Sequence, residues 1–506
     1  MAAEVKDECG VAAVSLGEDT APQWLYRLLL NMQNRGQLSA GITTFNPSRA
    51  QLIDGRRDLG SVNEVFRMSI NGETQKIFER YKGEKGIAHV RYATCGNEGR
   101  ALAQPFERHH GRTWKWFSVA FNGNLANYVQ LRNDLQKSQY HIVHDTDTEV
   151  IMYEIMRTLW GKSKPDLREV FTRVTAKFDG AYNIVFINAD GDIVALRDPM
   201  GFRPLAYNIT GNSVVAASES TALLNSGLLE FKDLPPGKMI TVSNGNIVVE
   251  RFAECKKKAH CMFEWVYFSN VGSVIEGSPV YQTRRRLGME LANLETEDIN
   301  DDYIIIAVPS SSEPAASGYA EAMGVPKKEG LIRNRYIGRT FIEGEEKRKS
   351  DVELKFTALR EVIKGKKLIV IDDSIVRGNT SKRLVRFLKE HGGAKEVHMR
   401  ISCPPIVSPC FYGIDMSTFD ELIAARHVQD IKTGITEKET EAVAMEIGAD
   451  SVIYQTTPNL IKAIGIPKGD LCMACINGEY PTTCGNAMCK KAIENSCNNI
   501  KKRTYE

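Results

Sequence analysis

The stretch KLIVIDDSIVRGNT, residues 367–380, decides the fold class of the second half of the chain. Five mostly apolar residues lead into the paired acids Asp372 and Asp373, and a short turn follows that carries Arg377. A segment with helical spacing of its apolar residues begins at Thr380. This order predicts a buried strand, a loop and a helix.

The loop of residues 374–380 has the composition of an anion site. Ser374 and Gly378 lie in it, just before the expected helix, where unpaired backbone N–H groups and the helix dipole both favour a phosphate. Two carboxylates directly before such a loop suit sugar hydroxyls or a magnesium shell. An ordinary strand-to-helix turn with two solvated acids is the alternative, but the strand before the acids and the polar turn after them favour the site.

Strands and helices are expected to alternate around this stretch. Apolar runs at 303–308, 367–371 and 396–401 read as strands, and the alternation predicts a parallel sheet with helical crossovers. The segment 308–324, VPSSSEPAASGYAEAMG, leaves the first of these strands through a serine-rich turn into a helix. Ligands of open α/β sheets bind beyond the carboxyl ends of the strands, where both turns are expected to lie.

The first half of the chain carries a cysteine in an unusual place. Cys9 follows the octapeptide MAAEVKDE and precedes GVAAVSL, which reads as a strand. If residues 1–8 were removed, the α-amino group of Cys9, with a pKa of about 8, could take the thiol proton and make the cysteine a nucleophile. Cys9 considered alone is also compatible with a small buried hydrophobe. Two hairpins are expected further on, over residues 181–196 and 239–252.

The composition limits the class of protein. A chain of 506 residues suggests two or three domains of about 100–200 residues. Lys plus Arg number 65 and Asp plus Glu 63, so the net charge of +2 gives no reason to expect a nucleic acid or an acidic membrane as partner. No apolar run approaches the roughly 20 residues that span a bilayer. Eleven cysteines without an export signal predict reduced thiols in a cytoplasmic protein.

Several of these segments resemble known families. VIDDSIVRGNT closely resembles the phosphoribosyl pyrophosphate (PRPP) loop of type I phosphoribosyltransferases. Four segments of the first half resemble class II glutamine amidotransferases, whose nucleophile is an N-terminal cysteine: NRGQLSAGI (34–42), HVRYATCG (89–96), FNGNL (121–125) and DTDTEV (145–150). Both resemblances are combined in the amidophosphoribosyltransferase family, and together they cover roughly residues 9–481.

The resemblance implies a two-domain α/β and α+β fold. Residues 1–8 are expected to be a propeptide, and residues 9–252 a glutaminase domain with an N-terminal nucleophile and four α/β/β/α layers. Residues 253–481 are expected to form a phosphoribosyltransferase domain with a parallel sheet and a cysteine metal site. The cysteine-containing tail, 482–506, matches nothing and has no predicted role.

The resemblance also assigns roles in the glutaminase half. Cys9 is expected to be the nucleophile, with the Asn122 side chain and the Gly123 N–H as the oxyanion hole. The predicted glutamine-binding residues are Arg91, which suits the α-carboxylate, Asp147, which suits the α-ammonium, and Arg35. Phe121 stands where a histidine is common in the family.

In the phosphoribosyltransferase half, Asp372 and Asp373 are expected to hold the ribose hydroxyls, and the 374–380 loop the 5-phosphate. The other predicted PRPP and magnesium residues are Ser311, Ser374, Arg377, Gly378, Thr380, Arg339 and Lys355. The sequence departs from the family where Ser310 replaces an acid and Ser312 replaces a glycine. The 343–356 loop, expected to close over PRPP, is one residue short.

Four cysteines are candidates for a metal site. Cys472 and Cys475 form a CxxC pair, the spacing of two ligands on one metal. Cys261 and Cys410 lie in segments that resemble those supplying the other two ligands of a [4Fe–4S] cluster. Zinc, or no metal, is the alternative. A second metal site or free thiols remain open for the tail cysteines Cys484, Cys489 and Cys497, and free thiols are the simplest expectation for Cys95, Cys255 and Cys403.

The resemblance implies that glutamine, PRPP and water give 5-phosphoribosylamine, glutamate and pyrophosphate, the first committed step of purine synthesis. It further implies magnesium as a cofactor and a homotetramer inhibited by purine nucleotides. A non-catalytic paralogue that senses PRPP or nucleotides is the alternative, suggested by the altered serine loop and the shortened 343–356 loop. A narrower alternative keeps glutaminase activity alone.

Overall fold

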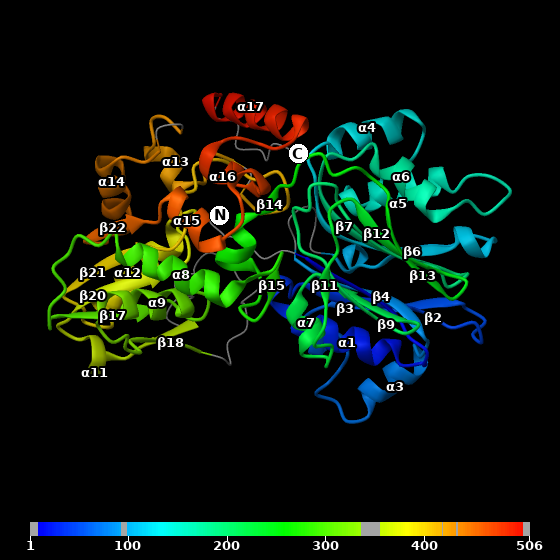
Figure 1. Ribbon diagram of the computed structural model, residues 1–506, viewed down its shortest axis with the longest axis horizontal. Helices are drawn as coiled ribbons and strands as arrows, with labels where there is room; N and C mark the ends of the chain where they lie inside the picture. The colour runs from blue at the N-terminus through cyan, green and yellow to red at the C-terminus, as the bar shows by residue number, and fades with distance from the viewer. Residues whose placement is uncertain (1–8, 93–98, 335–354, 417, 432–433, 499–506) are drawn as a thin grey trace.

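The computed structural model describes residues 9–92, 99–334, 355–416, 418–431 and 434–498. The first half contains two antiparallel sheets packed face to face (Figure 1). The first sheet has the order β11-β9-β10-β1-β4-β2-β3 and the second β13-β12-β8-β7-β6-β5. The strands of the first sheet are β1 (Gly10–Ser15), β2 (Ser39–Phe45), β3 (Ile53–Leu59), β4 (Lys85–Arg91), β9 (Ala206–Thr210), β10 (Ser213–Ala217) and β11 (Lys232–Asp233). Those of the second are β5 (Phe106–Arg108), β6 (Phe117–Leu125), β7 (Gly180–Asn188), β8 (Ile193–Arg197), β12 (Lys238–Ser243) and β13 (Asn246–Arg251).

Alternation of side chains along the strands creates the layers. On β1, Val11 and Ala13 point into the core between the sheets, while Ala12 and Val14 point to the helices outside. One helical layer covers the first sheet: α1 (Ala21–Asn31), α2 (Val62–Val65), α3 (Glu73–Arg80) and α7 (Ser220–Leu224). Another covers the second sheet: α4 (Tyr128–Lys137), α5 (Asp147–Thr158) and α6 (Leu167–Thr175). The predicted four-layer α/β/β/α arrangement is confirmed.

The second half is built on a parallel sheet of order β17-β20-β21-β22. Its strands are β17 (Tyr303–Ala307), β20 (Lys367–Asp372), β21 (Glu396–Ile401) and β22 (Ser451–Tyr454). One face packs against α8 (Val280–Ala292) and α9 (Glu313–Met323), and the other against α12 (Asn379–Glu390) and α14 (Glu437–Ile447). The three strands predicted in this half and the helix after the Asp-Asp pair are confirmed.

Shorter elements complete the second half. Three two-stranded ribbons pair β14 (His260–Cys261) with β23 (Leu471–Cys472), β15 (Val274–Ile275) with β16 (Ser278–Pro279), and β18 (Leu331–Arg333) with β19 (Phe356–Ala358). The remaining helices are the π-helical turn η4 (Glu264–Phe268), α11 (Arg360–Ile363), α13 (Ile423–His427), α15 (Thr457–Ile464), the 3₁₀ helix η6 (Lys468–Asp470), α16 (Ala474–Asn477) and α17 (Thr483–Cys497). None of the helices in the described ranges is long and apolar enough to cross a membrane.

The two halves share a buried contact. Phe202 of the first half stacks on Tyr412 of the second, with 4.4 Å between ring centroids. The Arg203 guanidinium donates to the Tyr412 carbonyl at 2.6 Å, and the Asn124 amide donates to the Phe411 carbonyl at 2.9 Å. The tail helix α17, red in Figure 1, also contacts the first half, because the Cys484 N–H donates to the Asp179 carboxylate at 3.2 Å. The predicted domain limit near residue 252 stays a prediction, supported by the end of the second sheet at Arg251.

Candidate active site

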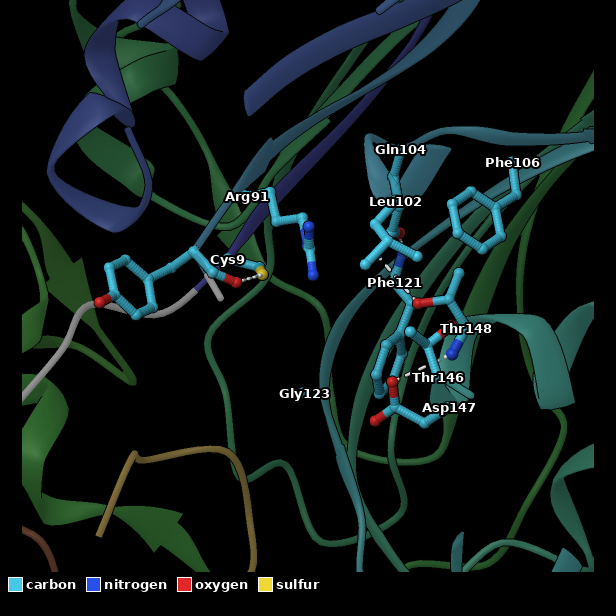
Figure 2. Close-up of a pocket in the computed structure, with 11 residues that line it drawn as sticks. Cys9, Arg91, Leu102, Gln104, Phe106, Phe121, Gly123, Thr146, Asp147 and Thr148 are labelled. Atoms are coloured by element: carbon cyan, nitrogen blue, oxygen red, sulfur yellow. Dashed lines mark hydrogen bonds between the residues drawn. The ribbon is translucent and has the colours of Figure 1, made fainter. Parts of the chain in front are cut away.

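Strand register brings Cys9 next to Arg91. β1 pairs antiparallel with β4 so that Gly10 lies opposite Val90, and the next residue on each strand is therefore Cys9 on one and Arg91 on the other. The Cys9 thiol lies 3.5 Å from the carbonyl oxygen of Tyr92. A pocket opens at this edge of the first sheet, and Figure 2 shows Cys9 and Arg91 on one side of it.

The opposite side of the pocket contains Asp147. It is the first residue of α5, whose N-cap Thr146 accepts a hydrogen bond from the Glu149 N–H at 3.3 Å. Burial raises the pKa of Asp147 to about 6, against the lowering effects of nearby backbone N–H groups and of Arg91. The pocket therefore holds a thiol, a cation and an acid on three separate elements. It is lined by Cys9, Arg91, Tyr92, Leu102, Gln104, Phe106, Phe121, Gly123, Thr146, Asp147 and Thr148.

The strand β6 supplies Asn122 and Gly123, the predicted oxyanion donors. The Asn122 side-chain amide donates to the Ser218 hydroxyl at 3.3 Å. That hydroxyl in turn accepts from the Val11 N–H at 3.0 Å, two residues after Cys9. Ser218 thus connects the strand of the candidate nucleophile to the strand of the candidate oxyanion donors, across the two sheets.

Gly123 has no acceptable substitute in this backbone. Its φ of 148° lies where residues with a Cβ are strained, and a Cβ there would lie 1.9 Å from the Ala181 carbonyl oxygen. The close approach of β7 explains why the Asn-Gly pair occurs within a strand rather than in a hairpin turn.

Arg35 is not among the residues that line this pocket, and its role in binding glutamine stays a prediction. Its guanidinium is buried between two carboxylates, with Nε at 2.8 Å from Glu219 and Nη2 at 2.6 Å from Glu264. In this chain Arg35 joins the two halves, because its buried guanidinium is paired with a carboxylate from each of them.

A second group of polar residues lies at the carboxyl edge of the parallel sheet. β17 and β20 are neighbours, with Ala307 opposite Ile371, so the serine turn and the Asp-Asp pair that follow these strands lie side by side. The Ser311 hydroxyl donates to Asp373 at 2.5 Å, and the Ser312 hydroxyl donates to Asp372 at 3.3 Å. Ser312, where the family has a glycine, thus contacts one of the two acids directly.

Asp373 is buried, and this raises the pKa of its carboxyl, opposed by hydrogen bonds from Ser311 and Ser374 and by the charge of Arg284. The loop then reaches Gly378, which adopts φ 79° as the N-cap of α12. The predicted strand, loop and helix N-terminus are therefore present, and Thr380 lies in the first turn of α12.

Two other residues predicted to bind PRPP, Arg377 and Lys355, contact neighbouring parts of the chain. The Arg377 guanidinium contacts Glu421 at 2.8 Å and the Asp415 carbonyl at 2.9 Å, so its charge is directed to the 415–421 segment. Lys355 follows the 335–354 segment and accepts a backbone hydrogen bond from Asn334 at 2.8 Å. Arg339 and most of the 343–356 loop lie outside the described residues.

The four candidate metal ligands are buried and gathered in one region. The pairing of β14 with β23 places Cys261 opposite Cys472. Burial, and to a smaller extent the charges of the nearby cysteines, raises the pKa of the Cys475 thiol well above its usual range. In the described part of the chain, no three cysteine, histidine or acidic side chains are arranged to hold one metal ion. A single zinc needs four sulfurs about 3.8 Å apart, whereas a cluster binds each cysteine through a different iron and spaces the sulfurs more widely. Four thiols gathered in one buried region are a donor set that either a cluster or zinc can use.

Comparisons with known proteins agree with the division into two domains. A glutamine amidotransferase domain model matches residues 72–235, and a phosphoribosyl transferase domain model matches residues 283–405. The chain is 38% identical over 503 residues to the amidophosphoribosyltransferase of Methanothermobacter thermautotrophicus, covering 98% of each chain. The chain belongs to the amidophosphoribosyltransferase family.

Further relatives agree with this assignment. The amidophosphoribosyltransferase of Bacillus subtilis is 38% identical over 493 residues, covering 95% of this chain and 96% of the relative. A solved structure of the glutamine PRPP amidotransferase from B. subtilis, complexed with ADP and GMP, matches with a TM-score of 0.81 at 36% identity and covers 94% of this chain and 98% of that chain. The family's two-domain fold and enzymatic class are thus shown for this chain.

Sequence reasoning missed several residues that shape the sites. Ser218 and Gln104 act through contacts with residues 96 and 17 positions away, respectively, and a local pattern carries no sign of such contacts. Arg284, whose charge acts on Asp373, is buried on α8 and was not predicted as part of the site.

Proposed function

We propose that this enzyme converts glutamine, PRPP and water to 5-phosphoribosylamine, glutamate and pyrophosphate, the first committed step of purine synthesis. The observation that carries the proposal is the presence in one chain of a thiol pocket with Arg91 and Asp147, and of an acid-lined phosphate loop at residues 372–380. The membership of the family supports joining the two into one reaction. A sensor of PRPP has no need for the thiol pocket.

In the first half-reaction, we assign the nucleophile to Cys9. Its thiolate attacks the amide carbon of glutamine, and the α-amino group freed by loss of residues 1–8 takes the thiol proton and passes it to the leaving ammonia. Arg91 binds the α-carboxylate and Asp147 accepts from the α-ammonium. Water then cleaves the thioester and releases glutamate.

The oxyanion formed during this attack is stabilised by β6. The Asn122 amide has two N–H groups, of which one donates to Ser218, and the other is assigned to the oxyanion together with the Gly123 N–H. Donors fixed in a strand need little reorganisation as charge develops, which is why such groups accelerate acyl transfer.

In the second half-reaction, ammonia reaches the parallel-sheet domain and displaces pyrophosphate from the anomeric carbon of PRPP. Asp372 and Asp373 hold the ribose hydroxyls, and the N–H groups at the start of α12 hold the 5-phosphate. Magnesium, when bound, neutralises pyrophosphate charge, and the carboxylate and hydroxyl oxygens at this edge are the ligand type it prefers.

We also propose a [4Fe–4S] cluster on Cys261, Cys410, Cys472 and Cys475, a homotetramer, inhibition by purine nucleotides, and a location in the cytoplasm. The solved relative with ADP and GMP supports nucleotide binding. Buried thiols with raised pKa support a cluster, because metal binding is what makes four thiolates acceptable in an apolar region.

The replacement Cys9→Ser tests the proposal most simply. We expect glutamine-dependent synthesis to fall to background, while synthesis from added ammonia continues at the parent rate, because the two half-reactions use residues of different domains. The measurement is phosphoribosylamine formation with each nitrogen source. Equal loss of both activities would contradict the separation.

The pKa of Asp147 predicts how glutamine binding depends on pH. Since the protonated acid, with a pKa of about 6, cannot pair with the α-ammonium, the dissociation constant for glutamine should rise about tenfold per unit below pH 6. Titration of the Cys9→Ser variant, which binds without turnover, measures this. In the double variant Cys9→Ser/Asp147→Asn, glutamine binding should be weak and independent of pH. If the dissociation constant for glutamine of the Cys9→Ser variant does not change through pH 6, Asp147 does not bind the α-ammonium.

The replacements Asp372→Asn and Asp373→Asn keep side-chain size and remove one charge each. A lost charge-assisted hydrogen bond costs roughly 1.5–3 kcal/mol, so PRPP should bind about one to two decades more weakly. Glutaminase activity without PRPP should barely change. If both variants bind PRPP as tightly as the parent, the two acids are not PRPP ligands.

Metal analysis of the purified enzyme tests the cysteine site. We expect four irons per chain, a brown colour and loss of both in Cys475→Ser. Cys403→Ser is the matched control, because Cys403 is also buried but is not assigned as a ligand. Stoichiometric zinc without visible absorbance would replace the cluster with a zinc site, and no metal would remove the site.

A further inference from the structure

The side chain of Gln104 connects two walls of the thiol pocket. Its Oε1 accepts from the Phe121 N–H at 2.9 Å, on the strand of the oxyanion donors. Its Nε2 donates to the Thr148 hydroxyl at 2.9 Å, on the helix of Asp147. Gln104 is 5% exposed, and Figure 2 shows it on the side of the pocket that faces Cys9 and Arg91.

The register of the second sheet explains why a side chain makes this contact. β5 pairs with β6 from Arg108 opposite Phe117 to Phe106 opposite Val119, and the same register continued would place residue 104 opposite Phe121. The ladder stops before that point, at Pro105, which has no N–H to donate. The Gln104 side chain therefore satisfies the Phe121 N–H where the strand no longer does.

The hydrogen bonds also fix which way the amide points. The Phe121 N–H can only donate, so Oε1 must face it, and Nε2 is then left to donate to Thr148. At the carbonyl of the same residue, which belongs to the peptide that leads into Asn122, the His89 ring lies 3.0 Å from the Phe121 oxygen. The backbone N–H and the carbonyl of Phe121, the residue before Asn122, both therefore have a side-chain hydrogen-bond partner.

The contact continues to the acid of the pocket. The Thr148 N–H donates to the Asp147 carboxylate at 3.0 Å, and Thr148 is 3% exposed. A single chain of hydrogen bonds therefore runs from the peptide before the oxyanion donors, through Gln104 and Thr148, to the acid at the other end of the pocket. The groups at its two ends are those assigned above to the amide oxygen and to the α-ammonium of one glutamine molecule.

We propose that Gln104 is a positioning residue for the glutamine half-reaction, which sets the distance between the oxyanion donors and Asp147. The inference rests on the roles proposed above for Asn122, Gly123 and Asp147. With the bridge intact, a glutamine held at its α-ammonium places its amide oxygen at the donors. Without it, glutamine still binds through Arg91 and Asp147, but its amide oxygen is misplaced.

The expected signature is a loss in kcat rather than in KM. A misplacement of about 1 Å can cost about 10²-fold in rate, so Gln104→Met, which keeps the length and removes both hydrogen bonds, should lower the glutaminase kcat by about 10- to 100-fold. KM for glutamine should change little, and synthesis from ammonia should not change. Gln104→Glu should recover part of kcat, because its carboxylate can accept hydrogen bonds from the Phe121 N–H and from the Thr148 hydroxyl.

Gln455→Met is the matched control. Gln455 is also buried, with Nε2 donating to the Leu287 carbonyl at 2.8 Å and Oε1 accepting from the Thr456 N–H at 3.0 Å, but it lies in the other domain. It should lower the thermal unfolding midpoint without lowering the glutaminase kcat. If Gln104→Met behaves like this control, with an unchanged kcat, Gln104 is merely structural and the inference is overturned.

Two further variants keep the outcomes distinct. Thr148→Val removes only the hydroxyl and should also lower the glutaminase kcat. If Gln104→Met fails to fold, a lowered kcat in Thr148→Val supports the inference and an unchanged kcat overturns it. Asn122→Ala and Asp147→Asn are measured in the same glutaminase assay. If both lose activity while Gln104→Met retains it, only the positioning role fails, whereas if both retain activity, the proposed roles at the pocket fail as well.

Discussion

The arrangement of the two halves depends on one buried group of charges, in which Arg35 lies between Glu219 and Glu264. Burial alone would raise the pKa of Glu264, but the charges of Arg35 and Arg203 hold it at about 2. Removing one member of such a group leaves an unpaired buried charge and costs about 3–5 kcal/mol. Since Arg35 and Glu219 belong to the first half and Glu264 opens the π-helical turn of the second, the two halves are held in one relative position.

The same region continues towards the acid edge of the parallel sheet. Arg284 of α8 donates to the carbonyls of Trp265, Tyr267 and Ser269, which satisfies the irregular turn after Glu264. Burial lowers the pKa of Arg284 to about 10, and the first charge opposing this is that of Asp373. The acid edge of the parallel sheet and the charges that join the halves therefore belong to one electrostatic neighbourhood around Arg284.

The fold was predictable where local pattern determines it. The apolar strand before Asp372, the glycine at the start of α12 and the two hairpins follow from periodicity and turn chemistry, and the structure confirms them. Cys9 and Arg91 could be paired only through family resemblance, because their proximity comes from the register of β1 and β4. The contacts of Arg35 could not be predicted from its motif, since nothing local indicates that Glu264, 229 residues away, is its partner. Ser218 and Gln104 were missed for the same reason.

The central claim is that one chain couples glutamine hydrolysis to the use of PRPP. The most direct measurement follows glutamate and pyrophosphate together, in one reaction supplied with both substrates and magnesium. The account predicts equal amounts of the two products throughout the reaction, with phosphoribosylamine formed in the same quantity. Glutamate without pyrophosphate would indicate a glutaminase alone, and release of neither product would indicate a binding protein; either result would contradict the account.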